Sequence, residues 1–161
     1  MKLELTNKIL RNDAYKKLLE QLHELESDRK FCKHDMEHFV SVARITLVLC
    51  SEKGVSIDPD IVYAAALLHD IGRAEQYTNG TPHDIASVHL AREILEEVGC
   101  ADAMQGKILS LIGSHRSKDN AENSLESIFY IADKRSRLCF CCDAQDECNW
   151  YIDKRNMEIK V

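Results

Sequence analysis

The sequence is short of residues that break helices, with two prolines and six glycines in 161 positions. Tight hairpins between short strands depend on these residues, so their scarcity argues against a β-rich fold and favours helices. The sequence also lacks an apolar run long enough to cross a membrane, and residues 1–7 lack the apolar core of a signal peptide. We therefore expect a helical, cytoplasmic protein with no membrane partner.

Long blocks of like charge are absent as well. The 27 acidic and 21 basic residues are interspersed and give a formal net charge of −6. Nucleic-acid-binding proteins usually carry a basic stripe, so we expect no nucleic-acid partner. The seven cysteines are an odd number that cannot all pair within one chain, which is typical of free thiols in a reducing compartment. The length and the 45% hydrophobic content suit one globular domain.

Apolar residues recur at spacings of three and four in several segments, which predicts an all-α protein. The expected helices cover roughly residues 13–26, 34–50, 59–70, 82–98, 101–115 and 123–137. Residues 72–80 are expected to form a loop, and Thr81 and Asn123 to cap the helices that follow them. From Asn149 onward, the pattern does not decide between a stub of strand near Val161 and a tail on the surface.

The most informative stretch is the apolar run of residues 64–68, which leads directly into His69-Asp70 before Gly72 stops it. Imidazole and carboxylate groups together suit a divalent metal. Adjacent helical residues point about 100° apart, so both side chains reach one site only at a helix end. In the alternative interpretation, His69 merely caps the helix and Asp70 begins a turn.

Three more histidines and one aspartate fall at comparable places. His38 lies on an early expected helix, His83 begins the fourth and His115 ends the fifth. Asp133 lies among apolar residues of the last helix, where a carboxylate is costly to bury unless it is paired or binds a metal. The alternative is that Asp133 faces solvent beside Lys134.

The order His38, His69-Asp70 and Asp133 resembles that of the metal-dependent HD phosphohydrolase superfamily. Residues 37–44, 67–72 and 130–134 look like the segments that carry its ligands. The resemblance covers about residues 33–137 and implies a compact all-α HD-domain bundle of about six helices. We expect a single domain over residues 1–161, with the N-terminal helix and the cysteine-containing tail packed on that core.

Further histidines refine the resemblance, because His83 and His115 stand where dinuclear members place extra ligands. The branch that this pattern resembles hydrolyses diadenosine tetraphosphate symmetrically with a di-iron site. The resemblance implies one metal held by His38, His69, Asp70 and Asp133, and a second held by Asp70, His83 and His115. Iron or manganese is expected, with zinc, magnesium, cobalt or nickel as alternatives. Residues 135–142 depart from the pattern expected in that branch, which leaves the substrate open.

The resemblance implies an enzyme that cleaves a phosphoester or phosphoanhydride of a nucleotide or dinucleoside polyphosphate with a metal-activated water. The expected catalytic residues are Asp70, Arg73 and Lys134. The expected substrate-binding residues, chosen for their position beside the ligands, are His34, Arg73, Arg116 and Lys134. The expected partner is a small nucleotide, and the chain could form a homodimer. The alternative is a catalytically silent HD-fold sensor that binds a nucleotide.

His34 and the cysteine-rich segment leave alternatives open. Residues 34–38 match H-x-x-E-H, as an inverted zinc-peptidase motif would, but that assignment leaves His69-Asp70 and Asp133 unexplained. His34 is otherwise a group beside the metals or a surface histidine. The cluster Cys139, Cys141, Cys142 and Cys148 lacks the C-x2-C spacing of a strong metal site. Its thiols are expected to pack a C-terminal cap, with a further metal or a redox switch as alternatives.

Overall fold

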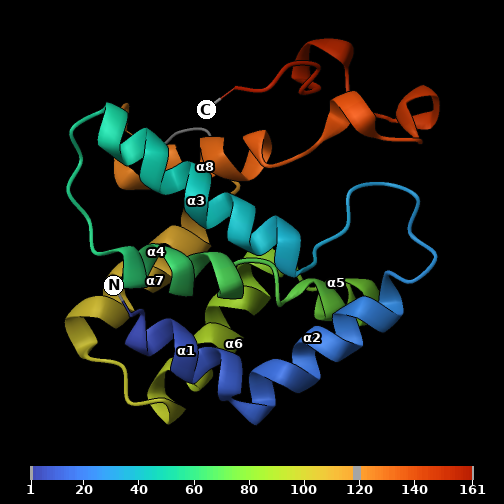
Figure 1. Ribbon diagram of the computed structural model, residues 1–161. Helices are drawn as coiled ribbons and strands as arrows, with labels where there is room; N and C mark the ends of the chain where they lie inside the picture. Colours follow the sequence, from blue (N-terminus) through green and yellow to red (C-terminus); the bar gives the residue numbers. More distant parts are fainter. Residues whose placement is uncertain (1, 118–120, 161) are drawn as a thin grey trace.

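A computed structural model describes residues 2–117 and 121–160, and this part of the chain is all-α, with no strand (Figure 1). The α-helices are α1 (Glu4–Arg11), α2 (Asp13–Leu25), α3 (Met36–Glu52), α4 (Pro59–Leu68), α5 (Arg73–Asn79), α6 (His83–Glu97), α7 (Asp102–Ser114) and α8 (Leu125–Arg135). Three short 3-10 turns follow, η1 (Cys139–Cys141), η2 (Gln145–Glu147) and η3 (Ile152–Lys154). The predicted fold class is confirmed. No helix in the described residues has the length and apolar content of a membrane span.

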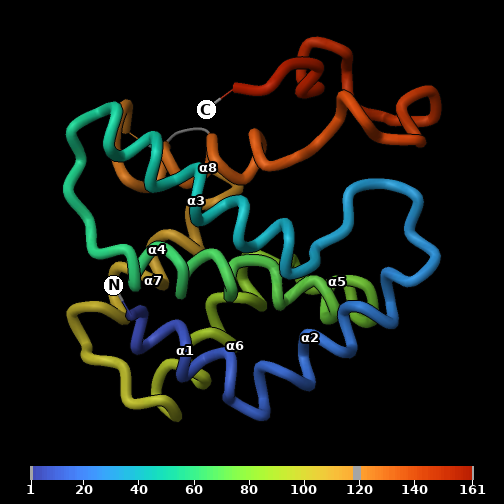
Figure 2. Tube along the Cα trace, viewed as in Figure 1, coloured from blue at the N-terminus to red at the C-terminus, as the bar shows by residue number. Residues whose placement is uncertain are grey.

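Helix α4 is the centre of the bundle and packs against α1, α3 and α7. Seven of its ten residues are buried, including three successive alanines that let neighbouring helices approach closely. A helix that is apolar on all sides must lie inside the fold. Helices α3 and α8 lie side by side above α4, and α1, α2 and α6 lie below it (Figures 1 and 2). The C-terminal end of α4, and the residues that follow it, therefore lie in the middle of the protein.

Helix α5 occupies residues that the sequence was expected to leave as a loop, and that expectation is wrong. Its seven residues are mostly polar, and only Ala74 is buried, so no apolar periodicity reveals the helix. Gly80 ends it in the left-handed region with φ of 82°, as glycine commonly does after a helix.

Helix α1 is the other short element that the count of about six helices did not include. The carboxylate of Asp60, in the first turn of α4, accepts hydrogen bonds from the backbone N–H groups of Leu5 and Thr6, both at 2.8 Å. These bonds satisfy donors that every helix start leaves unpaired, so α1 is fixed by a residue more than fifty positions away. A local pattern does not contain that information.

Two helix starts lie one residue later than predicted. Pro82 has an extended backbone, with ψ of 126°, so α6 begins at His83 and Thr81 is not its cap. Ser124 caps α8 by accepting from the backbone N–H of Ser127, while Asn123 adopts a positive φ of 61° outside the helix.

The C-terminal segment forms short turns rather than a strand in its described part. Arg155 holds it together by donating to three backbone oxygens at 2.8–2.9 Å, those of Gln145, Cys148 and Trp150. All seven cysteines are free, and the groups of three or more convergent ligands found in the described residues contain none of them. Val161, the end of the stub expected from the sequence, lies outside the described residues.

Gly72 lies where the turn after α4 passes against α6, and it supplies the first test. Its N–H donates to Ser87 Oγ at 2.9 Å. A Cβ at this position would overlap the backbone nitrogen of Ser87 and lie 2.6 Å from the His83 carbonyl oxygen. We expect Gly72→Ala to lower the free energy of unfolding by about 1–3 kcal/mol, measured by urea denaturation.

Gly106 in α7 is the matched control, because an added Cβ there meets nothing within 4 Å. Gly106→Ala should leave stability unchanged or raise it by up to about 1 kcal/mol, since alanine is the better helix former. A Gly72→Ala protein as stable as the wild type would show that this close approach does not constrain the fold.

Candidate metal centre

Six buried side chains meet in the middle of the bundle, and none is more than 8% exposed. They come from α3, from the turn after α4, from the first residue of α6, from the residue after α7 and from α8. The six are His38, His69, Asp70, His83, His115 and Asp133. The structure thus brings together every residue that the sequence nominated as a metal ligand.

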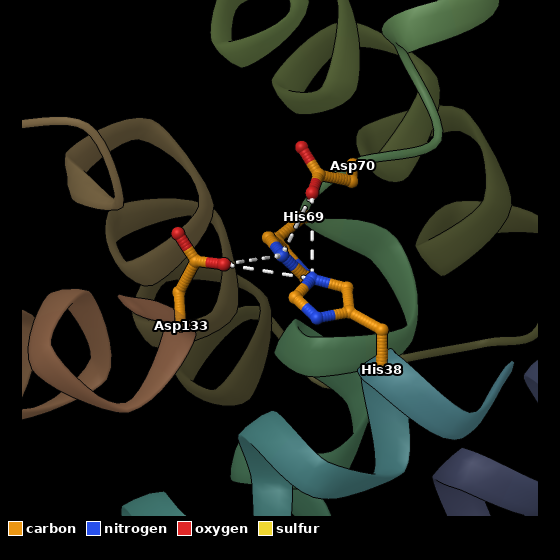
Figure 3. Close-up of side chains that lie close together, drawn as sticks. All are labelled: His38, His69, Asp70 and Asp133. Atoms are coloured by element: carbon orange, nitrogen blue, oxygen red, sulfur yellow. Dashed lines mark ion pairs between the residues drawn. The ribbon is translucent and has the colours of Figure 1, made fainter. Parts of the chain in front are cut away.

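The first group consists of His38, His69, Asp70 and Asp133, whose candidate ligand atoms all lie within 4.8 Å of one another (Figure 3). His69 Nε2 lies 3.1 Å from Asp70 Oδ2 and 3.8 Å from Asp133 Oδ1. His38 Nε2 lies 3.6 Å and 3.5 Å from the same two oxygens.

These four atoms share an uncommon property, because each is buried and has no hydrogen-bond partner. Buried polar atoms in folded proteins are nearly always paired, since leaving one unpaired costs about 1–3 kcal/mol. Two imidazole nitrogens and two carboxylate oxygens facing one point are a donor set that suits a divalent cation. The residues therefore fit a metal ion.

The second group consists of Asp70, His83 and His115. Asp70 Oδ1 lies 3.2 Å from His83 Nε2 and 3.7 Å from His115 Nε2, while Asp70 Oδ2 faces the first group. The two imidazole Nε2 atoms are 3.1 Å apart. Asp70 therefore offers one oxygen to each group, as a carboxylate that bridges two ions would.

In both groups, the Nδ1 atom of each histidine has a hydrogen-bond partner. A proton on Nδ1 leaves the lone pair of Nε2 directed at the centre, which is the form that binds a metal. The Nδ1 partners are the Ala66 carbonyl oxygen for His69, the Ile112 carbonyl oxygen for His115, Gln76 Oε1 for His83 and Ser136 Oγ for His38. Ser136 Oγ itself donates to the Asp133 carbonyl oxygen, so it accepts from His38.

His34 has the same arrangement one turn before His38. Its Nδ1 lies 2.6 Å from Glu26 Oε1, and its Nε2 is buried, unpartnered and 3.8 Å from Asp70 Oδ2. His34 is only 1% exposed, so the surface interpretation is wrong. The sequence did not reveal Glu26, because it follows the separate helix α2 and carries no ligand spacing of its own.

The three predicted cations are placed differently. Arg73 Nε donates to Asp70 Oδ1 at 2.8 Å, and Lys134 Nζ pairs with Asp133 Oδ2. Arg116 instead pairs with Asp84 at 3.0 Å, and half of its side chain is exposed. Two of the three cations therefore form ion pairs with carboxylates of the candidate metal centre.

Arg137 is a buried cation at the centre that the sequence analysis did not nominate. Its Nη2 lies 3.7 Å from Asp133 Oδ1. Burial lowers the pKa of this guanidinium, but Asp133, Cys32 and Asp70 together more than offset burial and raise it. The spacing of four residues from Asp133 is a signal that could have identified Arg137, because residues at that spacing share a face of the helix expected over residues 123–137. Arg137 itself lies just beyond the end of α8.

The buried carboxylates keep their charge. Burial raises the pKa of Asp70 and of Asp133, but His69 and the neighbouring cations hold both well below the ordinary value. Conversely, burial lowers the pKa of His69, and the two carboxylates raise it to about 9. The two buried carboxylates are therefore stabilised by a positive charge beside them, which either a proton on His69 or a metal ion can supply.

Comparison with known proteins finds a matching family and several similar proteins. The family described as HD domain matches residues 35–138, a range that contains all six ligands. A protein of Clostridium beijerinckii described as uncharacterized is 42% identical over 153 residues, which are 95% of this chain and 96% of that protein.

Ribonuclease Y proteins match over a shorter range. Ribonuclease Y of Mycoplasma mycoides subsp. mycoides is 26% identical over 125 residues, or 78% of this chain. Ribonuclease Y of Clostridium kluyveri is 30% identical over 115 residues, or 71% of this chain. The chain spans 23% and 20% of the length of these two proteins. No solved structure matches the chain.

Metal analysis tests the two groups separately. The wild-type protein should bind two equivalents of Mn²⁺, and His83→Ala or His115→Ala should each lose one, because only the second group is broken. His89→Ala is the matched control, since His89 lies on the same helix as His83 but is exposed, pairs with Glu93 at 3.7 Å and belongs to neither ligand group. A single equivalent in the wild type that His83→Ala leaves unchanged would indicate a mononuclear site.

The pH dependence of metal binding provides a further test. Because the pKa of His69 is raised to about 9, the metal must displace a proton at neutral pH. Affinity for Mn²⁺ should rise about tenfold per pH unit between pH 7 and 9, and binding at pH 7 should release about one proton. Calorimetry in two buffers of different ionisation enthalpy measures that proton. Affinity independent of pH in this window would contradict the assignment of His69 as a ligand.

Proposed function

The chain belongs to the HD domain family, and on that premise we propose that it is a metal-dependent phosphohydrolase acting on a nucleotide or a dinucleoside polyphosphate. The observation that carries the proposal is the set of four buried, unpartnered ligand atoms contributed by His38, His69, Asp70 and Asp133. A fold that only bound a nucleotide would gain stability by pairing or replacing these atoms. Their retention supports an enzyme over the silent sensor.

Divalent ions bound by this ligand set would supply Lewis acidity and an activated water for attack on phosphorus. Asp70 would contribute one carboxylate oxygen to each group. Arg73 and Lys134 lie on the ligand carboxylates with side chains 17% and 34% exposed, so both can also reach a phosphoryl oxygen. Their charges would stabilise negative charge that develops on the phosphoryl group. His34 would contact the substrate from the other side of Asp70.

Diadenosine tetraphosphate is the dinucleoside polyphosphate that we would test first, with iron or manganese. The two convergent groups support a dinuclear centre of the kind that the resemblance implies. Arg116, on the surface beside His115, is assigned to a more distant phosphate. A small anionic substrate needs only these few cations and agrees with the net charge of −6.

A second candidate is the cleavage of a phosphodiester bond in RNA. The similarity to ribonuclease Y over 115–125 residues favours it. The chain spans less than a quarter of those proteins, and its charge is unfavourable for a long polyanion. The small nucleotide is therefore preferred.

The experiment is a hydrolysis assay with Mn²⁺ or Fe²⁺ on nucleoside mono-, di- and triphosphates, diadenosine tetraphosphate and a short RNA. We expect metal-dependent release from a nucleotide, abolished by a chelator and lowered roughly 100-fold or more in kcat/KM by Asp133→Asn. His89→Ala should retain wild-type activity, because His89 is exposed and remote from the ligands.

Two results would contradict the proposal. Tight nucleotide binding without hydrolysis under either metal would favour the sensor. Cleavage confined to the short RNA would favour the second candidate.

A further inference from the structure

The C-terminal segment and α8 line an open cavity of about 510 Å³ outside the metal centre. Its walls are aromatic and cationic, formed by Tyr130, Lys134, Asn149, Trp150, Tyr151 and Lys154. Among these described lining residues there is no carboxylate. The volume lies in the range of small-molecule sites, roughly 300–1,000 Å³. Of the site residues predicted from the sequence, Lys134 lines this cavity and the others do not.

Lys134 connects the cavity to the metal centre. Its Nζ pairs with Asp133 Oδ2. The other carboxylate oxygen of Asp133 is directed toward His38 and His69 (Figure 3). The same Nζ lies 5.2 Å from the ring centre of Tyr130, one turn earlier on α8. A ligand with its phosphate at the metal centre would therefore pass Lys134 and place its remaining part between the aromatic rings.

We propose that this cavity receives the nucleobase of the substrate. The inference rests on the proposed function and names the part of the substrate that the metal centre does not bind. Aromatic rings suit any base, because every base has a face on which to stack. Lys134 and Lys154 add positive charge to the cavity wall, which suits a nucleotide, and the amide of Asn149 carries both a donor and an acceptor for a base edge.

The wall that carries Trp150 is held in place by the protein. The side-chain amide of Asn156 donates to the carbonyl oxygens of Lys134 and Arg137 at 2.8 and 2.9 Å and ties the tail to the end of α8. Arg155 Nε donates to the Trp150 carbonyl oxygen at 2.9 Å. The guanidinium of Arg137 also lies 5.2 Å from the Trp150 ring centre. A preorganised ring loses less freedom when a base stacks on it, which favours binding.

Arg137 joins the two sites, since its other contact is with Asp133 Oδ1 at 3.7 Å. One buried cation thus touches both a metal ligand and an aromatic wall of the cavity. Two side chains, Lys134 and Arg137, therefore each contact both Asp133 and an aromatic residue of the cavity wall.

Intrinsic fluorescence tests the inference, because Trp150 is the only tryptophan in the sequence. The metal-loaded protein is titrated with adenosine 5′-monophosphate, with ribose 5-phosphate and with a short single-stranded oligoadenylate. We expect a saturable change of emission with the adenosine nucleotide and none with ribose 5-phosphate. No change with either base-containing probe, or an equal change with ribose 5-phosphate, would overturn the inference. Oligoadenylate binding at least tenfold tighter than the mononucleotide would identify an RNA strand as the source of the base.

Substitutions locate the effect. Trp150→Ala and Tyr130→Leu should each weaken binding of adenosine 5′-monophosphate, measured by calorimetry, roughly 5- to 150-fold, and Trp150→Phe should restore most of it. Ile152→Ala is the matched control, because Ile152 lies in the same tail, is 76% exposed and does not line the cavity. Tyr130 lies on α8, so its variant does not depend on the folding of the tail. Wild-type affinity in both Trp150→Ala and Tyr130→Leu would refute the cavity assignment.

The binding experiment is independent of turnover. Hydrolysis of nucleotides without any change in Trp150 emission would refute the base site and leave the proposed function standing. Binding in the cavity without hydrolysis would support the base site and contradict the proposed function.

Discussion

The burial of two carboxylates, Asp70 and Asp133, is the constraint on which the rest of the structure depends. Each is 1% exposed, and a buried carboxylate is stable only when cations or donors surround it. The fold meets this demand with imidazoles from α3, from both sides of α5 and from the end of α7, and with cations from α5 and α8. These elements therefore meet at the end of α4 for two reasons. They bury an apolar core, and they surround the two carboxylates with compensating groups.

The sequence predicted the long helices and the ligands for different reasons. Apolar periodicity was sufficient for α3, α6, α7 and α8, each of which buries one face. A continuous apolar run indicated α4, which is buried on all sides. The six ligands came from their order along the chain and from a family resemblance, and the structure places them together. Periodicity failed at α5, which is polar, and with it the role of Gln76 as the partner of His83 was missed. Glu26 and Asp60 act on distant segments, and no local pattern reports such contacts.

The C-terminal segment changes how the centre is understood. Its composition suggested thiols that cap the bundle, with a further metal or a redox switch as alternatives, and the described cysteines form no convergent ligand group. The segment instead positions Trp150 against Arg137, which faces Asp133. Residues 135–142, which depart from the expected family pattern, include Arg137. In our proposal, the base is received by residues of α8 and by Asn149, Trp150, Tyr151 and Lys154, which follow that stretch in the same segment. Specificity in a shared fold is expected to arise at such a place.

Anomalous diffraction from a crystal grown with Mn²⁺ tests the central claim most directly. The account predicts a strong manganese peak bounded by His38 Nε2, His69 Nε2, Asp70 Oδ2 and Asp133 Oδ1, the four buried atoms that lack partners. Fully formed density for these side chains with no manganese peak among them, or with manganese bound only elsewhere, would contradict it.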